Sequence, residues 1–311
     1  SGVPVKVKNF EWKTIFNWSK NNSMVESLPE GIDKIQIGSG VYNVKSYAEV
    51  GKPYGAIYAK TFKRDAEGYI LCQLDGSPKE GQDYEYLGCV QADWRGGWNN
   101  VFRLGNSSFS VMFDFQKGGK FFSQTSIQSS VDGQSVKSLE GRDADFFSRK
   151  ILGESDEERY GFMRPQNANT PTANGQIYPD WGRPKGVVLP NCRYDEDVEG
   201  LAGQQVLGYC TPERYWMHYT SRDISRFIYD ASYVKLREIT VSYDLPKKWL
   251  RKTPFQTFRV AAVGRNIATL FANTPHGLDP QATSTTGNAQ GFERGFNLPS
   301  ATYGFDIKVS F

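Results

Sequence analysis

The last ten residues of the chain alternate without exception between apolar and polar or small side chains. The apolar positions of this segment are Tyr303, Phe305, Ile307, Val309 and Phe311. Because successive side chains of a β-strand point to opposite faces, the pattern predicts a strand with one apolar and one wet face. Less regular forms of the same alternation recur at residues 10–19 and 109–116. The chain is therefore expected to be an all-β protein with antiparallel strands.

The connections between the predicted strands fall into a short and a long class. Short turns are expected at 103–109 and 244–254, whereas the longest connection, 129–225, includes a candidate helix at 143–152. Short turns at one rim and long loops at the other are typical of outer-membrane β-barrels. A soluble sandwich shows the same alternation and stays an alternative. About eight strands are predicted, near residues 5–19, 41–48, 54–72, 98–104, 109–127, 227–243, 256–270 and 301–311.

Composition narrows the class of protein further. The 311 residues hold no apolar run that approaches the roughly 20 residues of a membrane helix. An aromatic content of 14% argues against disorder, and a net charge of +3 is too small to suggest a nucleic-acid partner. The mean hydropathy of −0.54 does not separate a soluble sheet from a membrane barrel, because barrel strands alternate apolar and polar residues. The basic run at 247–252 and the acidic run at 195–199 are expected to be solvated loops.

Catalytic and metal-binding signatures are missing from the sequence. It contains no nucleophile-elbow, zinc-protease or P-loop motif, and its two histidines make a histidine-based site improbable. No enzyme activity, metal or cofactor is therefore predicted. The four cysteines form two couples that are near in sequence, Cys72 with Cys89 and Cys192 with Cys210. They are candidates for two disulfides in an exported protein and for thiols in a cytosolic one, and the sequence leaves the pairing open.

Several segments, taken in order, resemble the SusC/RagA-type TonB-linked outer-membrane transporters. Single matches are weak, but the ordered set spans most of the chain apart from residues 129–225. The final strand, which ends in Phe311, resembles the terminal strand that outer-membrane assembly machinery reads. The matching segments are Trp12 to Asn17, Gly51 to Gly55, Tyr86 to Gly88, Phe113 to Gly119, Tyr229 to Pro246, Phe258 to Ile267 and Gly277 to Gln281.

The resemblance implies energised import across the bacterial outer membrane. Residues 1–311 would be the C-terminal part of a plugged barrel of about 22 strands, with 129–225 as an extracellular loop region. The plug and the N-terminal domains would lie outside this chain. The absence of a signal peptide before Pro4 agrees with a mature chain or a piece of a longer one. The implied partners are a SusD-like lipoprotein, the TonB complex, the remainder of the same polypeptide, outer-membrane lipid and an oligosaccharide or peptide cargo. A non-energised porin barrel and a soluble carbohydrate-binding sandwich are the alternatives.

Two sets of residues follow as site candidates. The outward positions from Tyr303 to Phe311 are predicted to face lipid and to serve as an assembly signal, while Asp306, Lys308, Glu11 and Lys13 would face the lumen. Aromatic side chains of the long loops are candidates for stacking on sugar rings, although packing of the loops onto one another or against the SusD-like partner is the better explanation for any single one. These candidates are Trp94, Trp98, Tyr178, Trp181, Tyr194 and Trp216.

Overall fold

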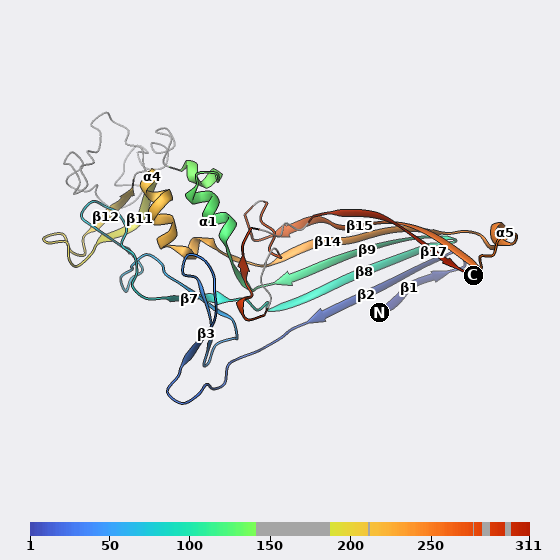
Figure 1. Cartoon of the computed structure of the whole chain (residues 1–311), viewed down its shortest axis with the longest axis horizontal. Coiled ribbons are helices and arrows are strands. Elements are labelled where there is room, and N and C mark those ends of the chain that lie inside the picture. Colours follow the sequence, from blue (N-terminus) through green and yellow to red (C-terminus); the bar gives the residue numbers. More distant parts are fainter. Residues whose placement is uncertain (141–186, 211, 276, 282–286, 296–299) are drawn as a thin grey trace.

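The computed structural model describes residues 1–140, 187–210, 212–275, 277–281, 287–295 and 300–311. Long strands lie side by side through one half of the molecule, and small sheets and helices gather at the other end (Figure 1). Within the described ranges, no helix combines the length and the apolar character needed to cross a membrane.

The long strands form one seven-stranded sheet in the order β1-β2-β8-β9-β14-β15-β17, in which every neighbouring pair is antiparallel. β1 and β17 are its two edges. The strands are β1 (Gly2–Val7), β2 (Phe10–Ser19), β8 (Trp94–Leu104), β9 (Ser107–Lys117), β14 (Tyr233–Asp244), β15 (Thr257–Ala272) and β17 (Thr302–Ser310).

The register of this sheet aligns apolar side chains on one face. Phe16 of β2 lies opposite Trp98, and Trp98 lies opposite Phe113. At the other edge, Phe305 lies opposite Ala262. The face is not covered by the described chain, and Phe305 is 86% exposed. A continuous exposed apolar surface of this kind marks contact with lipid or with another protein.

The two ends of the sheet differ as the loop lengths predicted. Tight turns join β1 to β2 and β8 to β9, and a short segment with helix α5 (Lys247–Leu250) joins β14 to β15. The C-terminus lies at this end, whereas the N-terminus lies partway along the edge of the sheet, where Gly2 pairs with Thr14 of β2 (Figure 1). The connections β2–β8, β9–β14 and β15–β17 are long and all leave from the opposite end, the loop end.

The loop end has its own secondary structure and both hydrophobic cores of the described residues. Its sheets have the orders β3-β4-β5-β7, β12-β11-β6 and β13-β10-β16. The strands are β3 (Lys34–Ser39), β4 (Lys45–Glu49), β5 (Ala56–Ala59), β6 (Ile70–Cys72), β7 (Glu85–Cys89), β10 (Lys120–Ser123), β11 (Val187–Tyr194), β12 (Gln205–Cys210), β13 (Ile228–Asp230) and β16 (Phe292–Glu293). The helical elements are α1 (Gln124–Val131), η1 (Val136–Leu139), α4 (Pro212–Arg214), η2 (Tyr215–Tyr219), η3 (Thr220–Arg222), η4 (Ile224–Phe227) and η5 (Gly287–Ala289).

The strand prediction needs three corrections. The predicted strand 5–19 is a hairpin of two strands, and 41–48 and 54–72 belong to the loop end instead of the long sheet. The predicted strand 109–127 stops at Lys117, because Gly118 and Gly119 adopt positive φ angles of 72° and 83° that end the extended conformation. Ser123 then caps α1 by accepting a hydrogen bond from the Ser126 backbone N–H. The candidate helix 143–152 lies outside the described residues.

Candidate functional site

The face of the long sheet opposite the apolar one carries charged side chains that pair across strands. Glu11 of β2 is 3.3 Å from the Lys6 ammonium and 3.9 Å from the Arg103 guanidinium. On β15, Arg265 is 3.0 Å from Glu238 of β14. Asp306 and Lys308 of β17 occupy the same face, as their alternation with the apolar residues predicted. The sheet therefore has one apolar and one charged surface.

A bulge in β14 enriches the charged face near the loop end. The register of β14 shifts between Leu236 and Glu238 against both neighbouring strands. The extra residue, Arg237, donates to Asp114 of β9 from Nε at 3.2 Å and to Asn266 of β15 from a terminal nitrogen at 2.6 Å. A β-bulge interrupts the alternation of side chains between the two faces of a strand. Arg237 and Glu238 therefore both make polar contacts, although they are consecutive in the chain.

Residues 277–281, which we call the strap, are pinned to this face. Lys235 of β14 is 4% exposed, and its ammonium lies 2.5 Å from one Asp279 oxygen and 2.6 Å from the other. The Gln281 side-chain oxygen Oε1 accepts from Lys235 at 3.0 Å and from Arg237 at 2.8 Å. The Gln281 amide nitrogen donates to the Tyr233 hydroxyl. A short loop is thus held against β14 by the two cationic side chains and the tyrosine hydroxyl of that strand.

A pocket of about 470 Å³ opens between the strap and the start of the loop end. It is comparable in size with the small-ligand pockets of other proteins. Charges of both signs line it, from Arg95 of β8, Asp114 of β9 and Lys120 of β10. Its remaining lining residues are Val90, Gln116, Phe121, Ala231, Tyr233, Pro280, Gln281, Gln290 and Gly291. We call this cavity the charged pocket.

A second cavity of about 530 Å³ shares Lys120 with the charged pocket and has a different chemistry. Its wall contains the ring of Tyr86, 41% exposed, together with amide side chains from Asn21, Asn22 and Gln91. We call it the amide pocket. Its full lining is Lys20, Asn21, Asn22, Ser23, Pro53, Tyr86, Gly88, Cys89, Gln91, Ala92, Asp93, Gly118, Gly119, Lys120 and Asp230.

Asp230 fixes the position of Lys120 between the two pockets. The Lys120 ammonium lies 3.4 Å from one Asp230 oxygen. Burial alone would raise the pKa of Asp230, but hydrogen bonds from Ser232 and Asn273 and the Lys120 charge lower it to about 2. Asp230 is therefore ionised throughout the physiological range.

The four aromatic candidates that the structure describes do not assemble into one surface. Trp94 and Trp98 lie in β8, not in a loop, and Trp98 stacks on Phe113 of the apolar face at 5.8 Å between ring centroids. Tyr194 and Trp216 are buried in the loop-end core, with 5% and 3% exposure. The structure therefore shows Trp98, Tyr194 and Trp216 packed against other side chains, while Trp94 lines a further cavity of about 280 Å³. Tyr178 and Trp181 lie outside the described residues.

Sequence reasoning missed the residues that line the pockets. The residues Arg95, Asp114, Tyr233 and Gln281 come from three strands and the strap, so no local pattern links them. The resemblance to the SusC/RagA-type transporters gave one indication of the site, because one of its matching segments, Gly277 to Gln281, forms the strap.

The acidic run at 195–199 is not simply a solvated loop. The Asp195 side chain is 3% exposed and lies 2.9 Å from the Lys63 ammonium and 2.6 Å from that of Lys79. Burial alone would raise the pKa of Asp195, but the hydrogen bonds from the two lysines lower it to about 2. The Asp197 side chain, by contrast, is 67% exposed, and of these two lysines it pairs only with Lys79.

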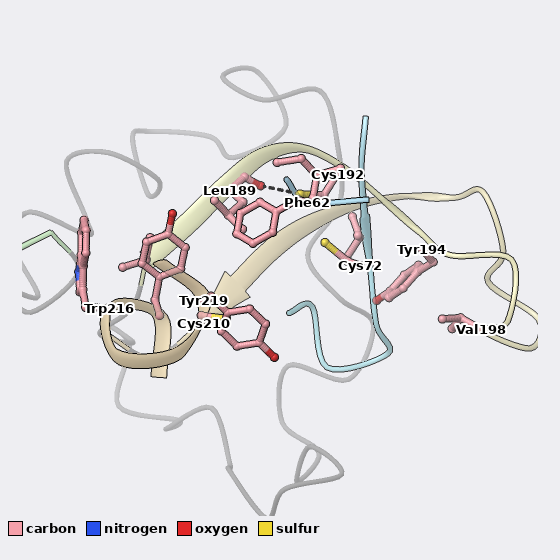
Figure 2. Close-up of a cluster of buried hydrophobic side chains, with 13 residues drawn as sticks. Phe62, Cys72, Leu189, Cys192, Tyr194, Val198, Cys210, Trp216 and Tyr219 are labelled. Atoms are coloured by element: carbon pink, nitrogen blue, oxygen red, sulfur yellow. Dashed lines mark hydrogen bonds between the residues drawn. The ribbon is translucent and has the colours of Figure 1, made fainter. Parts of the chain in front are cut away.

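All four cysteines carry thiols in the structure. Cys72, Cys192 and Cys210 lie in one buried cluster of the loop end (Figure 2). Cys89 is not part of this cluster and lies next to Tyr54 and Gln91. The couple Cys72 with Cys89 is therefore not formed. Among the described residues, no group of three or more histidine, cysteine or acidic side chains is placed to hold a metal ion.

Comparison with known proteins tests the resemblance. A curated protein named TonB-dependent receptor P3, from Formosa agariphila, is 22% identical over 318 aligned residues, which cover 95% of this chain and 26% of that protein. Structures described as the RagAB peptide transporter and as the RagAB peptide importer in an open-open state superpose on the whole chain with TM-scores of 0.54 and 0.53 and 15% identity. The match covers 28% of those chains. No family model matches.

The resemblance to TonB-dependent outer-membrane transporters is confirmed. The chain has the antiparallel fold of an outer-membrane transporter, and the bacterial outer membrane is its location. It spans about a quarter of the length of the relatives it matches. Those relatives are receptors or transporters and not enzymes.

Proposed function

We propose that the protein to which this chain belongs imports a nutrient oligomer across the outer membrane, with energy delivered through TonB. The observation that carries the proposal is a sheet with an exposed apolar face, a charged opposite face and two ligand-sized pockets where the strands meet the loop end. In a barrel this arrangement places lipid outside, water inside and the pockets at one mouth of the lumen.

The two edges of the sheet require further strands in this proposal. β1 and β17 each have a neighbour on one side only among the described residues. In a bilayer their unpaired backbone groups would each cost several kcal/mol. We therefore infer that other strands of the same polypeptide complete the barrel, that a plug fills it, and that residues 129–225 belong to the extracellular side. The apolar residues from Tyr303 to Phe311 would face lipid and act as the assembly signal.

An oligosaccharide is the cargo that the amide pocket supports. Amide and carboxylate side chains hydrogen-bond sugar hydroxyls, and a tyrosine ring packs on the apolar face of a pyranose. A peptide is the second candidate, because the charged pocket offers cations and an anion to a zwitterionic chain and because the RagAB neighbours are described as peptide transporters. A SusD-like lipoprotein and the TonB complex complete the proposed assembly.

Replacing Tyr86 by alanine separates the two cargoes. We expect Tyr86→Ala in the full-length transporter to weaken oligosaccharide binding about tenfold, the factor that corresponds to about 1.4 kcal/mol. Tyr84→Ala is the matched control, because Tyr84 also packs against a lysine but does not line the pocket. Calorimetric titration of the purified protein with nutrient oligosaccharides and with short peptides measures both affinities.

Each outcome of this titration has a meaning. Loss of oligosaccharide affinity in Tyr86→Ala alone supports the amide pocket as the cargo site. If Arg95→Ala instead abolishes peptide binding and no oligosaccharide binds, the cargo is a peptide. Equal affinities in both tyrosine variants would remove the amide pocket from the proposal.

A further inference from the structure

The basic run at 247–252 lies at the turn end of the long sheet, the end that carries the short connections. Helix α5 and the residues after it project beyond the strands there (Figure 1). Leu250 is 6% exposed and anchors the helix, whereas Trp249 is 60% exposed. The Leu250 carbonyl oxygen accepts from the Thr253 backbone N–H at 2.9 Å and from the Thr253 hydroxyl at 2.8 Å. The tryptophan is therefore displayed on a well-defined turn.

The cations beside Trp249 are not neutralised within the part of the chain that the structure describes. Their side chains are exposed, and none of them forms an ion pair with a described residue. Asp244, the nearest acidic residue in the sequence, is held by Arg259, which donates from Nε at 2.7 Å and from a terminal nitrogen at 2.8 Å. An exposed set of like charges attracts a partner of the opposite charge. The cations are Lys247, Lys248, Arg251 and Lys252.

The other short connections agree in charge with this turn. Lys8 lies in the turn between β1 and β2, and Gly105 and Asn106 form the turn between β8 and β9. Neither of these turns nor the connection 245–256 contains an aspartate or a glutamate. The loop end differs, because the acidic run at 195–199 belongs to it. The positive charge is therefore a property of the turn end as a whole.

Aromatic rings lie between the basic turn and the apolar face. Phe258 of β15 belongs to that face, where it is opposite Val309. The ring centroid of Phe255 is 5.9 Å from that of Phe258 and 5.3 Å from that of Phe311. The surface thus passes from aliphatic side chains to aromatic rings and then to Trp249 with its cations. A bilayer has the matching order, because aromatic residues gather at its interface and cationic side chains reach its headgroups.

We propose that the turn 247–252 binds the anionic headgroups of phospholipids in the periplasmic leaflet of the outer membrane. The short turns of outer-membrane barrels lie on the periplasmic side, which gives the leaflet. Phospholipid phosphates accept charge-assisted hydrogen bonds from lysine and arginine, and the ring of Trp249 would lie at the level of the headgroups. The inference rests on the proposed contact of the apolar face with lipid and is independent of the cargo.

Photo-crosslinking from position 249 identifies the lipid that contacts the turn. p-Benzoylphenylalanine replaces Trp249 in the full-length transporter, which is irradiated in vesicles of equimolar phosphatidylcholine and phosphatidylglycerol and then digested. Mass spectrometry of the labelled peptide gives the ratio of the two lipids. We expect about a fivefold excess of phosphatidylglycerol, the preference that one cation near an anionic surface provides. The excess should disappear in the variant that combines Lys247→Gln, Lys248→Gln, Arg251→Gln and Lys252→Gln.

The same amino acid at Tyr303 is the matched control. Tyr303 is 76% exposed on the apolar face and lies at the end of β17 that is remote from α5. We expect lipid adducts there as well, with equal amounts of the two lipids and no response to the four glutamine substitutions. Adducts at this position also show that the glutamine variant is inserted in the bilayer.

The remaining outcomes separate this proposal from the proposed function. Equal cross-linking of both lipids at position 249, or an excess that persists in the glutamine variant, would overturn the headgroup site. Adducts at position 303 but none at 249 would also overturn it and would leave the lipid contact of the apolar face intact. If neither position yields a lipid adduct, that lipid contact fails as well. In irradiated intact cells, a cross-link from position 249 to a protein instead of lipid would overturn the choice of partner.

Discussion

Phe305→Arg is expected to impair assembly of the barrel, because it places a charge on the apolar face midway along β17. Phe305 is 86% exposed, and its strand neighbour on that face is Ala262 of β15. An arginine that faces lipid near the bilayer midplane costs about 2–4 kcal/mol. Urea unfolding of the full-length protein in lipid bilayers measures this loss, and the level of protein in outer membranes should fall with it.

Asp306→Arg is the matched control for this substitution. It introduces the same side chain one residue further along β17, where the backbone directs it to the charged face. We expect a change of less than about 1 kcal/mol there, since a surface charge that stays in water contributes little. Equal losses in both variants would mean that the two faces of β17 meet the same environment, and the lipid assignment would be wrong.

Asp195→Asn should destabilise the loop end by about 3 kcal/mol. The substitution removes the charge that pairs with Lys63 and Lys79, and breaking a buried pair costs about 3–5 kcal/mol. The exposure of Lys63, 45% for its side chain, favours the lower end of this range. Amide hydrogen exchange of the segments around β6 and β11 measures the change, because local opening controls their exchange rates.

The pH dependence of this effect has a defined sign. The pKa of Asp195 is about 2 in the folded protein and about 3.9 in an unfolded chain. A lowered pKa contributes stability that is complete above pH 4 and is lost as the pH falls toward 2. The difference between wild type and Asp195→Asn should therefore shrink over that window. Asp197→Asn, at an exposed partner of Lys79, should change protection by less than about 1 kcal/mol.

The sequence predicted the membrane-type sheet because its signals are local. Alternation in the last ten residues needs no long-range information, and β17 forms there. The β1–β2 hairpin was missed although the chain marks it, since the apolar residues are odd-numbered from Val3 to Val7 and, apart from Ile15, even-numbered from Phe10 to Trp18. The change from odd-numbered to even-numbered apolar positions marks the turn between β1 and β2.

The candidate site was beyond local reasoning for a physical reason. The charged pocket joins Arg95, Asp114, Lys120 and Gln281, which only strand pairing and the strap bring together. The bulge at Arg237 also breaks the alternation inside β14. The aromatic residues were a poor guide to the site, because the sequence does not reveal whether a tryptophan ring lies in a loop, in a core or on the lipid face.

Accessibility along β17 tests the central claim that one face of this sheet lies in lipid and the other in water. Nitroxide labels carried by a genetically encoded amino acid, which leaves the cysteines intact, can be placed singly at residues 303–308 of the full-length protein in bilayers. Electron paramagnetic resonance should show odd-numbered positions relaxed mainly by oxygen, which concentrates in lipid, and even-numbered positions relaxed mainly by a water-soluble nickel complex. Accessibility to the nickel complex that is the same at odd and even positions would contradict the account.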